Sequence, residues 1–273
     1  MTPIRPKWLT FSHRSALALG LLASLGATIL GSTGAARADA LADITKAGVL
    51  KVGVFEDFPP FSFADTDLNL QGYDIDVANT LAKDLGVKVE LVGVTGQNRI
   101  PYLTEHKVDL LLSVGQNPER AKVIDFTDAY APYYITAMAP KAIAIKAPAD
   151  LKGKTVAVNR GTMEDTELTK VAPADADIQR YSDYNAVIAA FLSGQAQVMV
   201  VGNDVGASVL AKHATMEPEQ KFQLMNSPDH IGLNQNEPRL KQKLNDAIAQ
   251  MKKDGSLNAI SQKWLYLPLP KDL

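Results

Sequence analysis

Short apolar runs alternate with amphipathic segments through the first half of the chain after residue 48. Residues 49–54, 87–94 and 108–113 form apolar runs of strand length. Residues 74–85 and 100–106, which lie between these runs, carry apolar side chains at helical spacing, and Gly86 follows at a helix C-cap position. Strands that alternate with helices predict a parallel α/β sheet.

A second alternating set begins after Pro148. The predicted strands are residues 155–158, 178–181 and 198–201, and the predicted helices begin near residues 164, 184 and 205. A long helix from Pro238 ends at Asp254-Gly255, and a short final helix holds Ile260 and Trp264. The two sets predict two sheets and therefore two lobes.

Two segments are predicted to connect the lobes. Residues 130–139 contain no glycine and few polar side chains, which favours an extended crossing strand, and a return crossing is expected near residues 225–231. Lobe 1 then comprises residues 39–133 and 230–273, and lobe 2 comprises residues 134–229. Open α/β sheets bind ligands at the carboxyl ends of their strands, so we expect a ligand cleft between the lobes.

The first 38 residues have a different pattern. Basic residues precede an uncharged apolar stretch at residues 16–30, and Ala36-Arg37-Ala38 has the small-x-small form of a signal peptidase site. A membrane anchor is the alternative, but the stretch is shorter than the roughly 20 residues that a spanning helix needs. We therefore predict a signal peptide at residues 1–38, with Asp39 as the first mature residue.

Composition narrows the class of protein. The 273 residues are 46% hydrophobic and 21% charged, with a net charge of −2 and no cysteine. These values are typical of a globular protein, and interspersed charges argue against nucleic acid as a partner. Export without disulfides is typical of the bacterial periplasm. The four histidines are widely separated, so we expect neither a metal site nor a catalytic triad, and we predict no cofactor.

Candidate ligand-binding residues follow the predicted strands. Arg120 lies beyond the strand ending at Ser113-Val114-Gly115, and an arginine fork is the natural partner of a carboxylate. In lobe 2, Arg160-Gly161-Thr162 follows a strand, where a hydroxyl and free backbone amides receive an anion, although Thr162 also suits an ordinary N-cap. Asn203 and Asp204 follow the next strand. Either of them could bind an ammonium group or simply cap a helix.

Aromatic residues gather after the first strand. Phe55, Phe58 and Phe61 flank Pro59-Pro60 and could stack on an apolar part of a ligand or pack in the core. Core packing is the simpler interpretation for Phe61, whereas both interpretations stay open for Phe58.

Taken in order, several segments resemble the family 3 extracellular solute-binding proteins, the polar amino acid receptors of ABC importers. The segments that carry the resemblance are Phe58-Pro59-Pro60-Phe61, Gly72-Tyr73-Asp74-Ile75-Asp76-Val77, Asn98-Arg99-Ile100-Pro101, Pro118-Glu119-Arg120-Ala121-Lys122, Asp125-Phe126-Thr127-Asp128 with Tyr130, Asp150-Leu151-Lys152-Gly153-Lys154 and Gly161-Thr162. They cover nearly the whole mature chain.

The resemblance implies a type II periplasmic binding fold, with two α/β lobes that close over a ligand. It also implies that Arg120 binds the ligand carboxylate with help from Thr162, and that an aspartate near Asp204 binds the ammonium. The chain departs from the family pattern in two of these places. Val114 and Gly115 leave only Ser113 with a hydroxyl before the arginine, and Asp204 lies one or two residues beyond the usual aspartate.

The identity of the ligand is inferred from further similarities. Residues 97–101 are similar to a segment of acidic amino acid receptors, where the arginine that matches Arg99 can reach a distal carboxylate, and Arg160 is a second possible cation. Phe55 stands where many receptors for basic amino acids have an acidic residue. The expected ligand is glutamate or aspartate, with glutamine or another neutral polar amino acid second.

The expected protein is a periplasmic receptor whose partners are an amino acid and the permease subunits of an ABC importer, and which meets the membrane only through that permease. The alternative is an enzyme, because cyclohexadienyl dehydratases share this fold. Glu56, Asp57 and Glu164 are then candidates for the general acid. Nothing in their spacing singles one out, so we predict a binding protein without catalytic residues.

Overall fold

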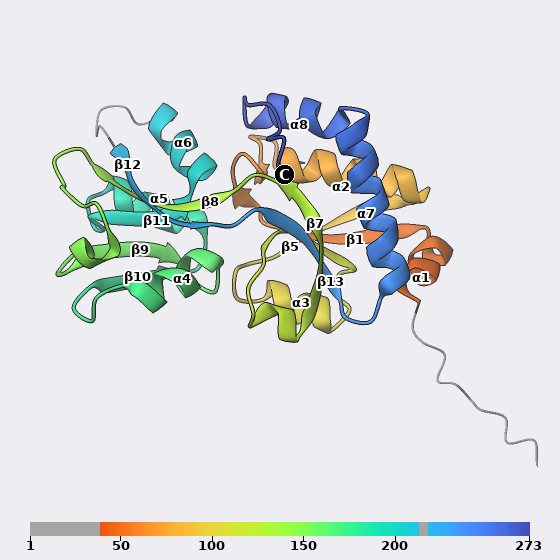
Figure 1. Ribbon diagram of the computed structural model, residues 1–273, viewed down its shortest axis with the longest axis horizontal. Coiled ribbons are helices and arrows are strands. Elements are labelled where there is room, and N and C mark those ends of the chain that lie inside the picture. Colours follow the sequence, from red (N-terminus) through yellow and green to blue (C-terminus); the bar gives the residue numbers. More distant parts are fainter. Residues whose placement is uncertain (1–38, 213–217) are drawn as a thin grey trace, which may run out of the picture. The chain divides into compact units, whose positions relative to one another are not determined.

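The computed structural model describes residues 39–212 and 218–273 (Figure 1). The predicted signal peptide at residues 1–38 and His213 lie outside the described residues. The described part of the chain forms two lobes, each built on a five-stranded sheet.

Lobe 1 begins with helix α1 and ends with helix α8. Its sheet has the strand order β5-β1-β6-β13-β7. Figure 1 shows α2 above β1 and α3 below it, and both helices contact that strand. The elements are α1 (Ala40–Ala47), β1 (Val49–Val54), α2 (Tyr73–Leu85), β5 (Lys88–Gly93), α3 (Arg99–Thr104), β6 (Leu110–Gly115), a 3-10 turn (Arg120–Lys122), β7 (Ile124–Ala131), β13 (Asp229–Asn234), α7 (Pro238–Lys253) and α8 (Ser256–Trp264).

Lobe 2 has the strand order β10-β9-β11-β8-β12, and it repeats the alternation of strand and helix. Most of β9 is buried, and β11 is buried at every position, as expected of strands in the middle of a covered sheet. The elements are β8 (Tyr134–Pro140), a 3-10 turn (Pro148–Leu151), β9 (Thr155–Asn159), α4 (Met163–Val171), β10 (Asp177–Tyr181), α5 (Tyr184–Leu192), β11 (Val198–Gly202), α6 (Asn203–Lys212) and β12 (Pro218–Asn226).

Local sequence signals explain the ends of several helices. Gly86 adopts a left-handed conformation with φ 70°, and its N–H reaches the carbonyls of Ala82 and Lys83, which terminates α2 as predicted. Asp183 caps α5 by accepting a hydrogen bond from the N–H of Ala186 at 2.8 Å. Pro238 occupies the first turn of α7, where its missing N–H leaves no hydrogen bond unmade.

The connections between the lobes differ in one respect from the sequence prediction. The predicted single crossing strand at residues 130–139 is two strands, β7 and β8, and the break falls at Pro132-Tyr133. The return crossing joins β12 to β13 through Ser227-Pro228, beside the first, and the N–H of Ser227 donates to the carbonyl of Tyr133 at 3.0 Å. Figure 1 shows both connections running between the lobes. The lobe boundaries drawn from the sequence stay a prediction.

The sheets are mixed rather than purely parallel. The helix-connected strands pair in parallel, as predicted, but β13 is antiparallel to β6 and β7. In lobe 2, β8 is antiparallel to β11 and β12. The reason is the double crossing, because a strand that enters a lobe from the other one runs opposite to the strands that start inside it.

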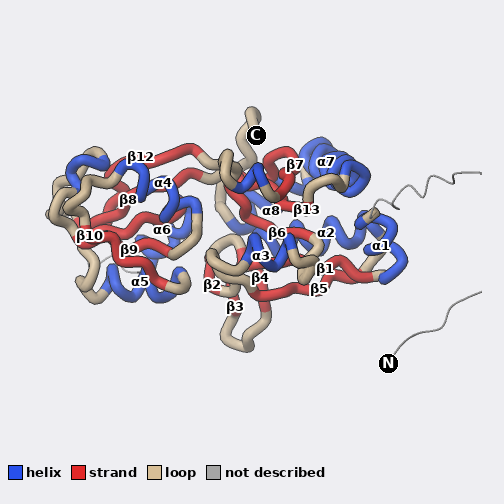
Figure 2. The backbone as a smooth tube through the Cα atoms, turned by 90° about the horizontal axis from the view of Figure 1, so that it is seen from below, coloured by secondary structure: helices blue, strands red, loops and turns tan. Residues whose placement is uncertain are grey.

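A small antiparallel sheet that the sequence did not indicate follows β1. Its strands are β2 (Asp57–Phe58), β3 (Ser62–Ala64) and β4 (Leu70–Gln71). Figure 2 shows it at the side of lobe 1 that faces lobe 2. Asp57 accepts a hydrogen bond from the N–H of Asn185 at 2.9 Å, so this sheet joins lobe 1 to the first turn of α5 in lobe 2.

Candidate ligand-binding site

A small cavity lies where the strand ends of both lobes meet the crossing segments. Lobe 1, lobe 2 and both crossings all contribute to its wall. The lining residues are Phe55, Phe58, Arg99, Ser113, Gly115, Arg120, Tyr133, Thr162, Met163, Glu164, Tyr184, Ser227 and Asp229.

Arg120 reaches the cavity from the turn after β6. Its side chain donates to the carbonyl of Gly115 at 2.9 Å and to that of Gly161, across the lobes, at 3.4 Å. Its backbone N–H donates to Asn117 Oδ1, which fixes the turn. Burial, and then the neighbouring charge of Arg99, lowers the pKa of Arg120 to about 10. The guanidinium therefore stays charged at neutral pH in a largely dry site, where a bound anion gains most.

Arg99 is more deeply held. One terminal nitrogen donates to the carbonyls of Leu112 at 2.6 Å and Ser113 at 2.9 Å, and the guanidinium lies 4.8 Å from the ring centroid of Phe55. Its Nε is buried and has no hydrogen-bond partner among the described residues. Burial lowers the pKa of Arg99, and nearby groups including Asp229 and Asp74 oppose this shift. Arg99 is thus fixed by the strand end, and its Nε is left for a further acceptor.

Ser113 lines the cavity, but its hydroxyl already donates a hydrogen bond to another residue of the chain. The hydroxyl donates to Asp74 Oδ2 at 2.7 Å, and the hydroxyl of Tyr130 donates to the other oxygen of Asp74 at 2.6 Å. Burial raises the pKa of Asp74 to about 6. Ser113 itself has φ 49°, so this network holds the end of β6 in a conformation that a serine rarely adopts.

Glu164 is the acidic side chain that lobe 2 places in the cavity wall. It lies in the first turn of α4 and is only 2% exposed. Its Oε1 accepts hydrogen bonds from the hydroxyls of Tyr133 at 2.5 Å and Tyr184 at 3.2 Å. Burial raises the pKa of both tyrosines well above the ordinary value, so both hydroxyls remain donors.

The crossing segments add two polar atoms without partners. Ser227 and Asp229 line the cavity, and within residues 39–212 and 218–273 their buried Oγ and Oδ2 atoms have no hydrogen-bond partner. Burial raises the pKa of Asp229 well above its ordinary range, whereas Arg99 lowers it. Buried polar groups in folded proteins are nearly always hydrogen-bonded, so unpaired atoms facing a cavity indicate a ligand position.

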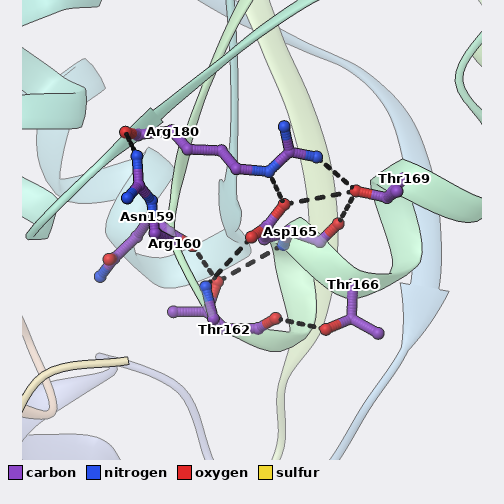
Figure 3. A network of polar contacts seen from close by, with 8 residues as sticks. Asn159, Arg160, Thr162, Asp165, Thr166, Thr169 and Arg180 are labelled. Carbon is purple, nitrogen blue, oxygen red and sulfur yellow. Dashed lines mark hydrogen bonds and ion pairs between the residues drawn. The ribbon is translucent and has the colours of Figure 1, made fainter. Parts of the chain in front are cut away.

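The turn between β9 and α4 carries the predicted Arg160-Gly161-Thr162 motif, and Figure 3 shows its polar contacts. Thr162 is the N-cap of α4, accepting from the N–H of Asp165 and donating to the carbonyl of Asn159 at 2.7 Å. The N–H of Gly161 donates to Asp165 Oδ2 at 3.1 Å. Thr162 lines the cavity, but these amide and hydroxyl groups already have partners within the lobe.

The side chain of Arg160 lies apart from the cavity. It is exposed and donates to the carbonyl of Arg180 at 3.2 Å, while Arg180 pairs with Asp165 at 2.7 Å (Figure 3). The contacts of Arg160, Arg180 and Asp165 therefore hold the turn between β9 and α4 without lining the cavity.

Asn203 and Asp204 do not line this cavity. Asn203 Oδ1 accepts a hydrogen bond from the N–H of Tyr134 at 3.0 Å, which ties the start of α6 to the crossing strand β8. Asp204 Oδ2 is buried without a partner, and burial raises the pKa of Asp204 to about 6. Their predicted role as ammonium partners stays a prediction.

Aromatic rings form the apolar side of the cavity. Phe58 stacks on Tyr184 of lobe 2 with ring centroids 4.6 Å apart, and Phe55 meets the same tyrosine edge-on at 5.5 Å. Phe61 is fully buried beneath Phe58 and does not line the cavity, in line with core packing. The aromatic contacts therefore join the lobes as well as enclosing the site.

The structure brings together most of the predicted site residues. Those in the cavity wall are Phe55, Phe58, Arg99, Ser113, Gly115, Arg120 and Thr162, whereas Arg160, Gly161, Asn203 and Asp204 are outside it. Sequence reasoning missed Tyr133, Met163, Tyr184, Ser227 and Asp229 as site residues and considered Glu164 only as a catalytic acid. The first helical turn after a strand end could have pointed to Met163, Glu164 and Tyr184, whereas nothing in the sequence pattern indicated which crossing residues face inward.

Two further properties of residues 39–212 and 218–273 concern metal ligands and membrane-spanning helices. Within those ranges there is no cluster of three or more potential metal ligands. Within the same ranges, every helix falls short of the length and apolar character that crossing a membrane requires.

Comparison with known proteins gives one family. The family described as bacterial extracellular solute-binding proteins, family 3, matches residues 50–266. The L-cystine-binding protein TcyJ of Escherichia coli K12 is 29% identical over 231 residues, which are 84% of this chain and 86% of TcyJ. A glutamate/aspartate import solute-binding protein of Salmonella typhimurium is 30% identical over 272 residues, which are 93% of this chain and 88% of the relative.

Solved structures give the same fold. A mutant of ArgBP from T. maritima has a TM-score of 0.78 at 28% identity, covering 84% of this chain and 100% of that one. An ancestral amino acid-binding protein described as a precursor of cyclohexadienyl dehydratase has a TM-score of 0.75 at 34% identity, covering 82% of this chain and 98% of that one. The family resemblance and the type II periplasmic binding fold predicted from the sequence are both confirmed.

Proposed function

Because the chain belongs to the bacterial extracellular solute-binding proteins of family 3, we propose that it is a periplasmic receptor that binds a polar amino acid between its lobes. Delivery to the permease subunits of an ABC importer is the other half of this proposal. The relatives support it, since they include an L-cystine-binding protein and a glutamate/aspartate import solute-binding protein. No chemistry on the ligand is required, because closure of the lobes around it is the functional event.

One observation carries the proposal. Three residues that line the same cavity each carry a buried polar atom without a partner in the described part of the chain, namely Arg99 Nε, Ser227 Oγ and Asp229 Oδ2. Leaving such groups unpaired costs ~1–3 kcal/mol each, so a ligand that pairs them is strongly favoured. They come from lobe 1 and from the return crossing, so a ligand bound to them lies at the point about which the lobes move.

Arg120 is the proposed partner of the ligand carboxylate. Its guanidinium lines the cavity, and its contact with the carbonyl of Gly161 places it between the lobes. An arginine fork donates two parallel hydrogen bonds to a carboxylate, which a neutral donor cannot match. The carboxylate would also stabilise a charge that burial disfavours.

The charges around the cavity bear on which amino acid is bound. Two cations, Arg99 and Arg120, share the wall with two acids, Glu164 and Asp229. Each arginine donates to two backbone carbonyls, but one of the two bonds from Arg120 is long at 3.4 Å, which leaves Arg120 as the freer cation. Arg120 and Glu164 then offer a ligand one pair of opposite charges, which suits a zwitterion without net charge better than a dicarboxylate. We therefore place a neutral polar amino acid first and the glutamate or aspartate expected from the sequence second.

The test is a ligand panel. Each of the twenty L-amino acids is added to the purified protein expressed from the full-length chain, after unfolding and refolding to remove bound ligand, and the melting temperature is measured. Those that raise it are titrated by calorimetry. Tight binding of a neutral polar amino acid supports the proposal, glutamate or aspartate alone would support the sequence expectation, and no response to any amino acid would refute the proposed function.

An enzyme remains the second candidate because of Glu164. Glu56 and Asp57 do not line the cavity, whereas Glu164 does, with a tyrosine hydroxyl 2.5 Å from one carboxylate oxygen. The dehydratase precursor with the same fold is itself described as an amino acid-binding protein. Incubation with prephenate or arogenate decides the matter, since aromatic product would establish catalysis and its absence alongside amino acid binding would support the receptor.

A further inference from the structure

We infer that Glu164 is the carboxylate that binds the ammonium group of the ligand, and that Tyr133 and Tyr184 hold it in position. This inference rests on the proposed function. It assigns to the first turn of α4 the role that the sequence gave to Asn203 or Asp204 at the start of α6.

The position of Glu164 complements that of Arg120. Arg120 belongs to lobe 1 and Glu164 to lobe 2, and both line one cavity. Glu164 is also among the charges that favour the protonated form of Arg120, so the two groups are electrostatically coupled. A zwitterion with its carboxylate on Arg120 and its ammonium on Glu164 spans the two lobes. Binding then favours the closed arrangement, because only that arrangement offers both partners at once.

The tyrosine hydroxyls leave one side of the carboxylate for a ligand. Both of them donate to Oε1, and within residues 39–212 and 218–273 no group donates to Oε2. Tyr184 is in turn fixed by its stacking on Phe58, 4.6 Å between ring centroids. Two donors on one oxygen restrict the rotation of the carboxylate, so its orientation is set before the ligand arrives.

Gly202, the last residue of β11, makes room for Tyr133. A Cβ atom on Gly202 would collide with the ring of Tyr133, so the tyrosine can lie against this strand end only because the residue is a glycine. Asn203 then binds the backbone N–H of Tyr134 at 3.0 Å. The strand end that was predicted to supply the ammonium partner instead shapes the crossing segment that presents Tyr133 to Glu164.

Asp229 is the other acid in the wall, but it suits the ammonium less well. It lies on the return crossing, and burial raises its pKa well above the ordinary range, which disfavours the charged form that an ammonium group needs. Asp204 lies outside the wall. Glu164 is therefore the acid in the wall whose hydrogen-bond partners, within the described residues, are neutral hydroxyls.

The test compares two ligands on matched variants by titration calorimetry. The first ligand is the L-amino acid that binds most tightly in the panel. The second is the des-amino acid, which is the same compound without its α-amino group; for L-glutamine it is 4-carbamoylbutanoic acid. Glu164→Gln is expected to weaken the amino acid at least ~30-fold and the des-amino acid less than ~3-fold, because truncating one partner of a buried charge pair costs that much or more. Glu167→Gln, which changes a carboxylate of the same helix that pairs with Lys170 outside the cavity, should change neither affinity.

Two further variants keep the test decisive. Tyr133→Phe removes only a hydroxyl and is expected to weaken the amino acid selectively, about 3- to 10-fold, even if Glu164→Gln is poorly folded. Asp204→Asn tests the alternative that Asp204 binds the ammonium group. Equal loss of both ligands in Glu164→Gln, or a selective loss in Asp204→Asn instead, would overturn the assignment, whereas failure of the unmodified protein to bind any amino acid would refute the proposed function itself.

Discussion

Replacing Arg120 with methionine separates binding from folding more cleanly than replacing it with alanine. Methionine fills similar space with an unbranched, adaptable side chain, so the cavity wall does not collapse. The change removes the guanidinium that donates to the carbonyls of Gly115 and Gly161. We expect amino acid binding to be lost while the fold is retained.

The effect on stability is a difference of two similar terms. Lowering the pKa of Arg120 from 12.5 to about 10 corresponds to ~3 kcal/mol of cost for holding its charge in the folded protein, and methionine removes this cost. Hydrogen bonds from a charged donor contribute ~1.5–3 kcal/mol each, and the contact with Gly161 is long at 3.4 Å and counts for less. The free energy of unfolding should therefore change by no more than ~2 kcal/mol.

The effect on affinity is much larger. Truncating one partner of a buried charge pair costs ~2–5 kcal/mol, which is about 30-fold to several thousand-fold in Kd. Calorimetric titration measures the affinity and denaturant unfolding measures the stability of the same preparation. Arg120→Lys is the matched control, because it keeps the charge without the planar fork and should recover only part of the affinity. If Arg120→Met binds the amino acid within about fivefold of the unmodified protein, the carboxylate does not bind at Arg120.

Two further predictions follow from single positions. Gly115→Ala places a Cβ atom 2.6 Å from Ser227 Oγ and 2.8 Å from Met163 Cγ. The change should weaken amino acid binding about tenfold by obstructing closure of the lobes, and it should lower the free energy of unfolding by ~1–3 kcal/mol. An unchanged Kd would show that closure tolerates the methyl group. Asp204→Asn should stabilise the protein at pH 8 by up to ~3 kcal/mol and hardly at all near pH 4. The reason is that the pKa of Asp204 is raised to about 6 in the folded protein, so its ionised carboxylate destabilises the fold only as the pH rises from 3.8 through 6. Melting temperatures that differ equally at both pH values would contradict this.

Periodicity in the sequence was enough to predict the repeating parts of the fold. Helix α5 was expected at residues 184–192 and occurs at Tyr184–Leu192, and the first strand was expected and found at Val49–Val54. Both elements bury a face whose spacing is visible in the sequence. Strand direction was not predictable in this way, because an apolar run reads the same whether its neighbour is parallel or antiparallel. The antiparallel pairing of β13 with β6 and β7 follows from the return crossing, a long-range feature.

The shortest strands could not be predicted from the sequence for a different reason. Strands β2 and β4 have two residues each, too few to show any alternation, and they form because the chain folds back around Phe58 and Phe61. Phe61 packs against Tyr73 as well, so the small sheet is also held by aromatic packing from the first residue of α2, the helix that follows it. Local propensity cannot express such a contact.

The position of Glu164 in the cavity wall shows why the location of strand ends alone does not identify the acidic site residue. The rule that ligands bind beyond the carboxyl ends of strands pointed equally to residues 203–204 after β11 and to residues after β9. The choice between them depends on which strand end is occupied by another side chain. Tyr133 fills the space over Gly202, and its hydroxyl reaches Glu164 at 2.5 Å, so the acid after β9 faces the cavity while Asp204 lies outside its wall. That outcome depends on a tyrosine from the crossing segment and a glycine nearly seventy residues later, a pairing that exists only once both lobes have formed.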